Sequence, residues 1–198
     1  MPSSSLVPRA SAAATILRHL LVWRATSFGY IGEPVSAASH MVQAARRARY
    51  LRLDEDVVLA CLFHDVGHLL APDNTEGFGV SDHARLGASL LRGLGLAERT
   101  CRAVELHADA KRYLVGDDPF YQLTPASEAT LESQGGAMIS SDERRVFESD
   151  LAFDDALAVR NCDDTSKVED LSPEEVGRAF EMFLPSIMRS VGGRTSYV

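Results

Sequence analysis

Apolar residues recur every three to four positions along almost all of the chain, which is the spacing of one face of an α-helix. No segment shows a convincing alternation of apolar and polar residues, the pattern of a half-buried strand. The predicted fold class is therefore all-α. Residues 139–150 are polar and are expected to be irregular. The expected helices cover residues 14–25, 34–51, 54–70, 81–91, 97–114, 124–134, 153–166 and 172–190.

A single domain is expected over residues 14–190, with loose segments at 1–13 and 191–198. Three interpretations of the first segment stay open. Residues 1–32 contain arginines but no acidic residue, as in an organelle-targeting leader. Residues 6–9 also resemble a protease site left by an expression vector. The plainest interpretation is a frayed chain end before the first helix.

Charge and cysteine usage narrow the class of protein. The net charge of −8 argues against binding nucleic acid, which requires a basic surface. A small anion needs only one or two local cations and is not excluded. The three cysteines are far apart and odd in number, which indicates reduced thiols. No apolar run is long enough to span a membrane, so the expected location is the cytoplasm, unless the first segment directs the chain to an organelle.

The segment CLFHDVGHLL at 61–70 carries the most informative chemistry. His64 and Asp65 are adjacent, so they can offer an imidazole nitrogen and a carboxylate oxygen to one metal ion. The second carboxylate oxygen can then reach another ion. Apolar neighbours predict burial, and buried charge persists only when it is paired or bound to metal. This segment alone is weak evidence, because one satisfied polar pair is common in a core helix.

Other histidines and an aspartate supply enough further ligands for two metal ions. The candidate metal ligands are His40, His64, Asp65, His83, His107 and Asp164. One ion would be held by His40, His64 and the last aspartate, the other by the remaining two histidines, and Asp65 would bridge them. Imidazole and carboxylate without thiolate suit iron, manganese, nickel or zinc. The second ion keeps open positions, as a catalytic metal requires.

An H…HD…H…H…D pattern on an all-helical chain resembles the HD-domain superfamily, and the two middle histidines mark its dinuclear members. More narrowly, the chain is similar to the mixed-valent di-iron HD oxygenases that cleave organophosphonates. The resemblance extends from about Ser27 to Lys167. The motifs that carry it are YIGEPV at 30–35, FHDVGHLL at 63–70, HADAKRYL at 107–114, LESQGG at 131–136 and RNCDD at 160–164.

The resemblance implies roles at both ends of a small zwitterionic substrate. Tyr30 would occupy an open iron position when substrate is absent, and Glu33 would receive the substrate's ammonium group. His68 and Lys111 lie four residues after His64 and His107, so each would share a helix face with a ligand and contact the phosphonate. The bland alternatives are a turn aromatic for Tyr30, a helix-start acid for Glu33 and a core histidine for His68.

Three further assignments depend on the same motifs. Thr130 and Gln134 lie one helical turn apart and are expected to touch the phosphonate, although a solvated helix face explains them equally well. Alignment with the family motif selects Asp164 as the ligand over Asp163, which is then a solvated or capping acid.

The implied function is an iron-dependent dioxygenase with two Fe ions, Fe(II) and Fe(III). It would use O2 to convert a 1-hydroxy-2-aminoethylphosphonate into glycine and phosphate. The expected partners are thus a small organophosphonate and O2, with no nucleic acid and no membrane. Three alternatives stay open: the same chemistry on an N-trimethylated substrate, an HD-type phosphohydrolase, and a non-catalytic metal-binding regulator. The residues do not indicate the oligomeric state.

Overall fold

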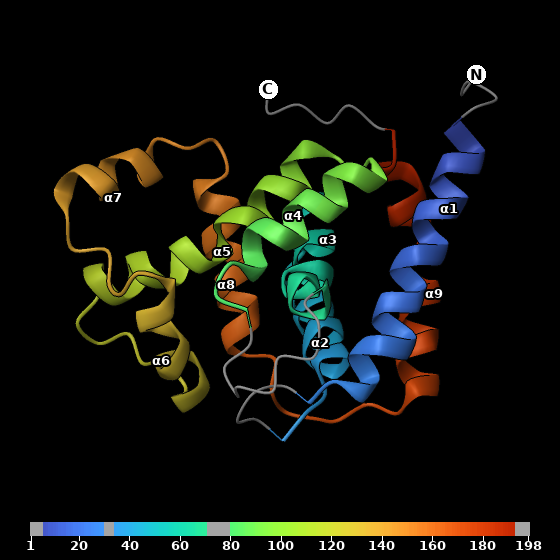
Figure 1. Ribbon diagram of the computed structural model, residues 1–198, viewed down its shortest axis with the longest axis horizontal. Coiled ribbons are helices and arrows are strands. Elements are labelled where there is room, and N and C mark those ends of the chain that lie inside the picture. Colours follow the sequence, from blue (N-terminus) through green and yellow to red (C-terminus); the bar gives the residue numbers. More distant parts are fainter. Residues whose placement is uncertain (1–5, 30–33, 71–79, 193–198) are drawn as a thin grey trace.

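The structure is a computed structural model that describes residues 6–29, 34–70 and 80–192 (Figure 1). The described residues form helices and no β-strand, and an isolated bridge pairs Gly29 with Ser36. The all-α prediction is confirmed. The α-helices are α1 (Leu6–Arg18), α2 (Ala37–Tyr50), α3 (Glu55–Phe63), α4 (His83–Leu94), α5 (Glu98–Asp117), α6 (Pro125–Leu131), α7 (Ser141–Glu148), α8 (Phe153–Asp164) and α9 (Pro173–Ser190). Shorter elements are the π-helical segment η1 (His19–Arg24) and the 3₁₀ turns η2 (Ala25–Ser27), η3 (Val66–Leu70) and η4 (Glu132–Gln134).

Helices α2, α3, α5 and α8 pack against one another at the centre, with α4 against α5 and α1 against α9 (Figure 1). Small residues allow this close central packing. Helix α2 buries alanines on most of its surface, among them Ala38, Ala44 and Ala45. Larger buried side chains such as Phe63 and Phe180 fill the remaining space. Burial of such a side chain stabilises the fold by about 1.5–3 kcal/mol.

Hydroxyl side chains begin four of the helices. At each, the N-cap oxygen accepts a hydrogen bond from the backbone N–H three residues later, which satisfies one of the unpaired donors of the first turn. Ser172 also forms a reciprocal capping box with Glu175 at the start of α9. The four N-cap residues are Ser36, Thr124, Ser140 and Ser172.

Two helix starts differ from the prediction. Helix α1 begins at Leu6 and not at Ala14, because Ala10 and Ala13 already pack into the main core. Helix α2 begins at Ala37 and not at Pro34, because Ser36 provides the cap. The expected loose tail is therefore wrong for residues 6–13, which are helical.

The expected continuous helix over residues 54–70 is also wrong. Helix α3 ends at Phe63, His64 and Asp65 form a turn, and the chain continues as the 3₁₀ turn η3. Gly67 lies so close to α4 that an added Cβ would be 1.9 Å from the His83 carbonyl oxygen. This contact with a distant helix selects the tighter turn, and local periodicity does not report it.

The region expected to be irregular contains α7, whose short polar sequence hides its amphipathic pattern. Phe147 is its buried residue and packs in a second core cluster with Met138 and Ala110. Helices α6 and α7 lie at one side of the molecule, away from α1 and α9 (Figure 1).

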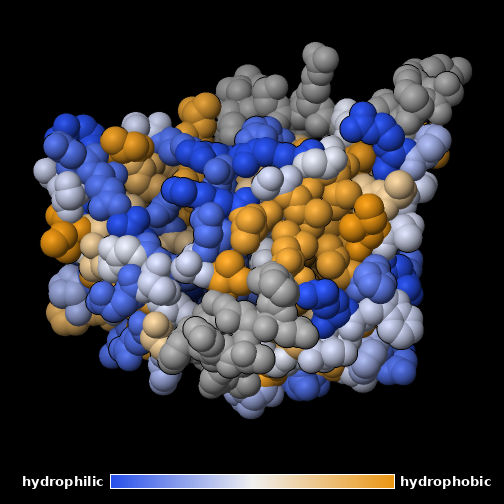
Figure 2. All heavy atoms as spheres, viewed as in Figure 1, coloured by the Kyte–Doolittle hydropathy of each residue, from blue (hydrophilic) through white to orange (hydrophobic). Residues whose placement is uncertain are grey.

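Hydrophobic side chains gather on one face over α4 and the space between α4 and α1 (Figure 2). Ile16 of α1 and Leu86 of α4 are among the exposed large apolar residues. Within the described ranges, no helix combines the length and the apolarity that crossing a bilayer requires.

Candidate metal centre and its pocket

Four buried histidines from four helical segments meet at the centre of the fold. His40 comes from α2 and His64 follows α3, and their Nε2 atoms are 3.0 Å apart. We call them the inner pair. His83 begins α4 and His107 lies in α5, and their Nε2 atoms are 3.1 Å apart. We call these two the outer pair.

The opposite nitrogen of every one of these rings faces a backbone carbonyl. The contacts are His40 Nδ1 to Ser166 O at 3.1 Å, His64 Nδ1 to Cys61 O at 2.9 Å, His83 Nδ1 to Val80 O at 2.9 Å and His107 Nδ1 to Val104 O at 2.7 Å. A carbonyl only accepts, so each Nδ1 carries a proton and each Nε2 points inward, where it is placed to bind a metal ion. A ring whose Nδ1–H donates to a carbonyl while its Nε2 binds the ion is the usual arrangement of metal-binding histidines.

Asp65 lies between the inner and outer pairs. Its Oδ2 is 3.3 Å from His64 Nε2 and 3.7 Å from His40 Nε2. Its Oδ1 is 3.4 Å from His83 Nε2 and 3.5 Å from His107 Nε2. Each carboxylate oxygen thus faces one histidine pair, as a bridge between two ions requires.

Asp163, and not Asp164, faces the inner pair, which corrects the assignment made from the sequence. Asp163 Oδ1 is 3.1 Å from His40 Nε2 and 3.9 Å from His64 Nε2. Asp164 instead accepts hydrogen bonds from Tyr121 and Arg160. One residue along a helix rotates a side chain by about 100°, so only one of two adjacent aspartates can face the histidines. Alignment with the family motif had selected Asp164, which does not face the histidines.

The donor set fits bound metal. Asp65 Oδ2 and Asp163 Oδ1 are buried and lack a hydrogen-bond partner within the part of the chain that the structure describes. Buried carboxylate oxygens are costly unless paired or bound to a cation. Ligand atoms of His40, His64 and Asp65, and of Asp65, His83 and His107, each gather within 4.8 Å. Imidazole and carboxylate oxygen suit divalent and trivalent iron.

Charge coupling within the centre appears in two pKa shifts. Burial alone would lower the pKa of His64, but Asp65 and then Asp163 outweigh it and raise the pKa to about 9. Burial likewise opposes ionisation of Asp163, but Arg160 and His40 hold the pKa of that carboxyl well below its usual range. The carboxylates are therefore ionised at neutral pH and attract positive charge to this site.

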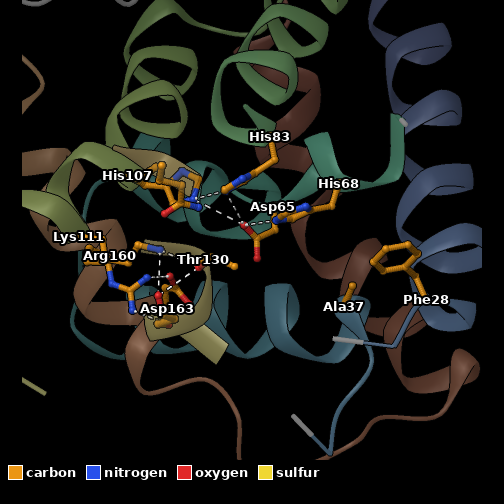
Figure 3. Close-up of a pocket in the computed structure, with 13 residues that line it drawn as sticks. Phe28, Ala37, Asp65, His68, His83, His107, Lys111, Thr130, Arg160 and Asp163 are labelled. Atoms are coloured by element: carbon orange, nitrogen blue, oxygen red, sulfur yellow. Dashed lines mark hydrogen bonds and ion pairs between the residues drawn. The ribbon is translucent and has the colours of Figure 1, made fainter. Parts of the chain in front are cut away.

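A pocket with about 600 Å³ of empty volume, its open mouth included, reaches the outer pair. Lys111, Thr130 and Arg160 lie together at one end, and Phe28 and Ala37 lie at the other (Figure 3). The inner pair does not line it. The remaining lining residues are Asp65, His68, His83, His107, Ala108, Ser127, Gln134 and Asp163.

Lys111 is 3% exposed, an unusual burial for a lysine. Its Nζ donates to Thr130 Oγ1 at 2.9 Å and to Ser127 O at 3.4 Å. Burial lowers its pKa to about 8, and Arg160 contributes to the shift. Lys111 is therefore an ammonium at neutral pH, and its buried position suits the binding of an anion.

Sequence reasoning missed Arg160 as a site residue. It is 4% exposed, lines the pocket and donates through Nη1 to Asp163 Oδ2 at 2.5 Å. A signal was available, since an arginine three and four residues before two aspartates on one helix can pair with both. Ser127, which also lines the pocket, was likewise missed.

Of the other candidate residues, those that the structure describes all line the pocket. His68 stacks on His83 with ring centroids 4.0 Å apart, and its Nδ1 accepts from Val80 N at 3.1 Å. The sequence suggested that His68 shares a helix with His64, but the structure places it on η3. Thr130 and Gln134 both line the pocket. Tyr30 and Glu33 lie outside the described residues.

Comparison with known proteins supplies the family context. Residues 37–150 match the family described as the HD domain. A protein of Acanthamoeba polyphaga mimivirus, whose name gives no function, is 35% identical over 145 residues, which cover 70% of this chain and 66% of that protein.

Two further relatives carry names that state an activity. A [1-hydroxy-2-(trimethylamino)ethyl]phosphonate dioxygenase (glycine-betaine-forming) of Leisingera caerulea is 32% identical over 170 residues, which cover 82% of each chain. A hydroxymethylphosphonate dioxygenase of Gimesia maris is 33% identical over 148 residues, which cover 72% of this chain and 73% of that protein.

Proposed function

The chain belongs to the HD-domain family, and on that premise we propose that it is a dioxygenase that cleaves the carbon–phosphorus bond of a 1-hydroxyphosphonate. One observation carries the proposal: two histidine pairs share Asp65, and the outer pair opens onto a pocket that ends in buried cations. The two relatives with named activities are phosphonate dioxygenases whose named substrates share a hydroxyl on the carbon that bears phosphorus.

Two iron ions would be held by His40, His64, Asp65, Asp163, His83 and His107, with Asp65 between them. When bound, they would supply O2 activation and Lewis acidity toward the substrate oxygens. The outer pair contributes only two histidines and a shared carboxylate, so it leaves coordination positions toward the pocket. Asp163 is held by Arg160 through Oδ2, which leaves Oδ1 for the inner ion.

The phosphonate would bind at the end of the pocket formed by Lys111, Thr130 and Arg160. Charge-assisted hydrogen bonds to an anion are shorter and stronger than neutral ones. Thr130 Oγ1 accepts from Lys111, which aims the ammonium into this end. His68 would add a ring nitrogen from the other side, close to the outer pair.

The specific substrate that we propose is 2-amino-1-hydroxyethylphosphonate. With one O2 it gives glycine and phosphate, and every atom of the reactants appears in these two products. Phe28 is the single aromatic residue other than histidine among the described lining residues. Recognition of a quaternary ammonium commonly uses several aromatic rings, so this lining favours the primary amine. Glu33 would receive the ammonium, and Tyr30 would occupy the open iron position before substrate binds.

The test is phosphate release from 2-amino-1-hydroxyethylphosphonate by iron-loaded protein, with and without O2. We expect release that needs both iron and O2, together with one glycine for each phosphate. Release from the N-trimethylated analogue alone would retain the mechanism and replace the substrate. Hydrolysis of a phosphate ester without O2, supported by manganese or magnesium, would reject the oxygenase in favour of an HD-type phosphohydrolase.

A further inference from the structure

Asp164 and Tyr121 form a compact network with Arg160 at the edge of the pocket. The Tyr121 hydroxyl donates to Asp164 Oδ2 at 2.5 Å and accepts from Arg160 Nε at 3.0 Å. Arg160 Nε also donates to Asp164 Oδ2 at 3.2 Å, and its Nη2 donates to Asp164 Oδ1. One edge of the guanidinium is thus bound in two places to the same carboxylate.

The other groups on Arg160 connect it to the site. Its Nη1 donates to Asp163 Oδ2 at 2.5 Å, and its Nη2 is 3.5 Å from Ser127 Oγ. Arg160 is nearly fully buried and lines the pocket beside Lys111 and Thr130 (Figure 3). The planar guanidinium is therefore held between two carboxylates that follow it by three and four residues on α8.

We propose that Asp164 and Tyr121 are positioning residues, which fix Arg160 so that it binds an anion in the pocket while it orients Asp163. The inference deepens the proposed function, because it assigns the groups that support the phosphonate end of the site. Both carboxylate oxygens of Asp164 accept hydrogen bonds from Arg160 or Tyr121, so this role replaces that of a metal ligand.

A free arginine side chain has many rotamers, and a fork of hydrogen bonds fixes its plane. Asp163 alone would hold the guanidinium only through Nη1 and would not fix its plane. Asp164 provides a second anchor of equal charge on the opposite edge, and Tyr121 fixes the direction of that carboxylate. Together they keep the cation at the pocket wall.

In Asp164→Asn, the direction of the change in anion affinity distinguishes a positioning role from a purely electrostatic one. Removal of a negative charge near the pocket would by itself tighten the binding of an anion. Loss of the anchor would instead let Arg160 withdraw and weaken that binding. The two effects oppose each other, so the direction of the change identifies the role.

The experiment is calorimetric titration of metal-loaded protein with inorganic phosphate, which shares the tetrahedral anionic group of a phosphonate. We expect Asp164→Asn to weaken phosphate binding by roughly tenfold and Tyr121→Phe by about threefold, the ordinary range for loss of charge-assisted and neutral hydrogen bonds. Metal content should equal that of the unaltered protein in both variants, because neither residue is a ligand.

Asp155→Asn is the matched control. Asp155 also lies on α8 and pairs through both oxygens with an arginine, Arg99, but it does not line the pocket. We expect it to lower thermal stability without a change in phosphate affinity. Unchanged or tighter phosphate binding in Asp164→Asn, or loss of metal from it, would overturn the positioning role.

The outcomes distinguish this inference from the proposed function. Phosphate binding that depends on Asp164, in a protein with no O2-dependent phosphate release, would support the inference and reject the oxygenase. Normal O2-dependent phosphate release, with phosphate binding unchanged in Asp164→Asn, would support the oxygenase and reject the inference. Failure of the unaltered protein to bind phosphate would overturn the assigned anion site.

Discussion

The inner and outer histidine pairs have the same geometry at the rings and different surroundings. His40 and His64 are fully buried and face two carboxylates, those of Asp65 and Asp163. His83 and His107 face only Asp65 and line the pocket. An ion at the inner pair would have its ligands from the protein, whereas one at the outer pair would keep positions for substrate or O2. Two histidine pairs with similar ring contacts therefore differ in their carboxylate neighbours and in their access to the pocket, because different helices surround them.

Removal of the Asp65 carboxylate should have the largest effect on activity and metal content, because Asp65 faces both histidine pairs. In Asp65→Asn, both pairs lose an anionic ligand, and we expect phosphate release to fall by at least ~10³-fold with at most about one metal ion per chain. Metal analysis and an initial-rate assay measure this change. Retention of two tightly bound ions would contradict the bridging role.

Single histidine substitutions should separate the two pairs. In His107→Ala the outer ion retains only two ligands, so we expect about one metal ion per chain. In His40→Ala the inner ion retains His64, Asp65 and Asp163, so the protein should hold both ions, the inner one more weakly. Metal analysis after dialysis against a weak chelator measures the difference. Equal losses from both variants would show that the pairs are equivalent.

The close approach of η3 to α4 supports the outer pair and can be tested at Gly67. An added Cβ would be 1.9 Å from the His83 carbonyl oxygen and 2.8 Å from Gly87 N. We expect Gly67→Ala to destabilise the protein by ~2 kcal/mol or more and to weaken metal binding at the outer pair. Thermal unfolding and metal analysis report the two effects.

Gly177→Ala is the control for Gly67→Ala, since a Cβ there would meet nothing within 4 Å and the residue is inside α9. It should stabilise the protein by ~0.5–1 kcal/mol, because glycine is unfavourable inside a helix. Full stability of Gly67→Ala with two bound ions would show that the contact does not support the site.

The smallest predicted effect concerns the pH dependence of anion binding beside the outer pair. Because burial lowers the pKa of Lys111 to about 8, the side chain loses its charge as pH rises through that value. The KM for the phosphonate should therefore be constant below pH 8 and rise about tenfold per pH unit above it. In Lys111→Met the KM should be higher at neutral pH and lack this rise. An identical rise in both proteins would assign the titration to another group.

The sequence predicted the fold class and located five of the residues that gather at the centre, because helical periodicity and the histidine–aspartate spacing are local signals. It selected Asp164 where Asp163 faces the histidines, since that choice depends on how α8 is rotated against α2 and α5. It missed the turn at His64 because the constraint on Gly67 comes from α4. Arg160 was not predicted as a site residue because its burial depends on packing, although the sequence contained its spacing from the two aspartates.

The central claim, that Asp65 bridges two iron ions, can be tested by electron paramagnetic resonance of protein loaded with iron and oxidised by one electron. A shared carboxylate should couple the ferric and ferrous ions magnetically, and we predict one spin-one-half signal that accounts for most of the bound iron pairs. The same treatment of Asp65→Asn should abolish it. A signal of isolated high-spin ferric iron in the unaltered protein, with no coupled species, would contradict the bridged centre.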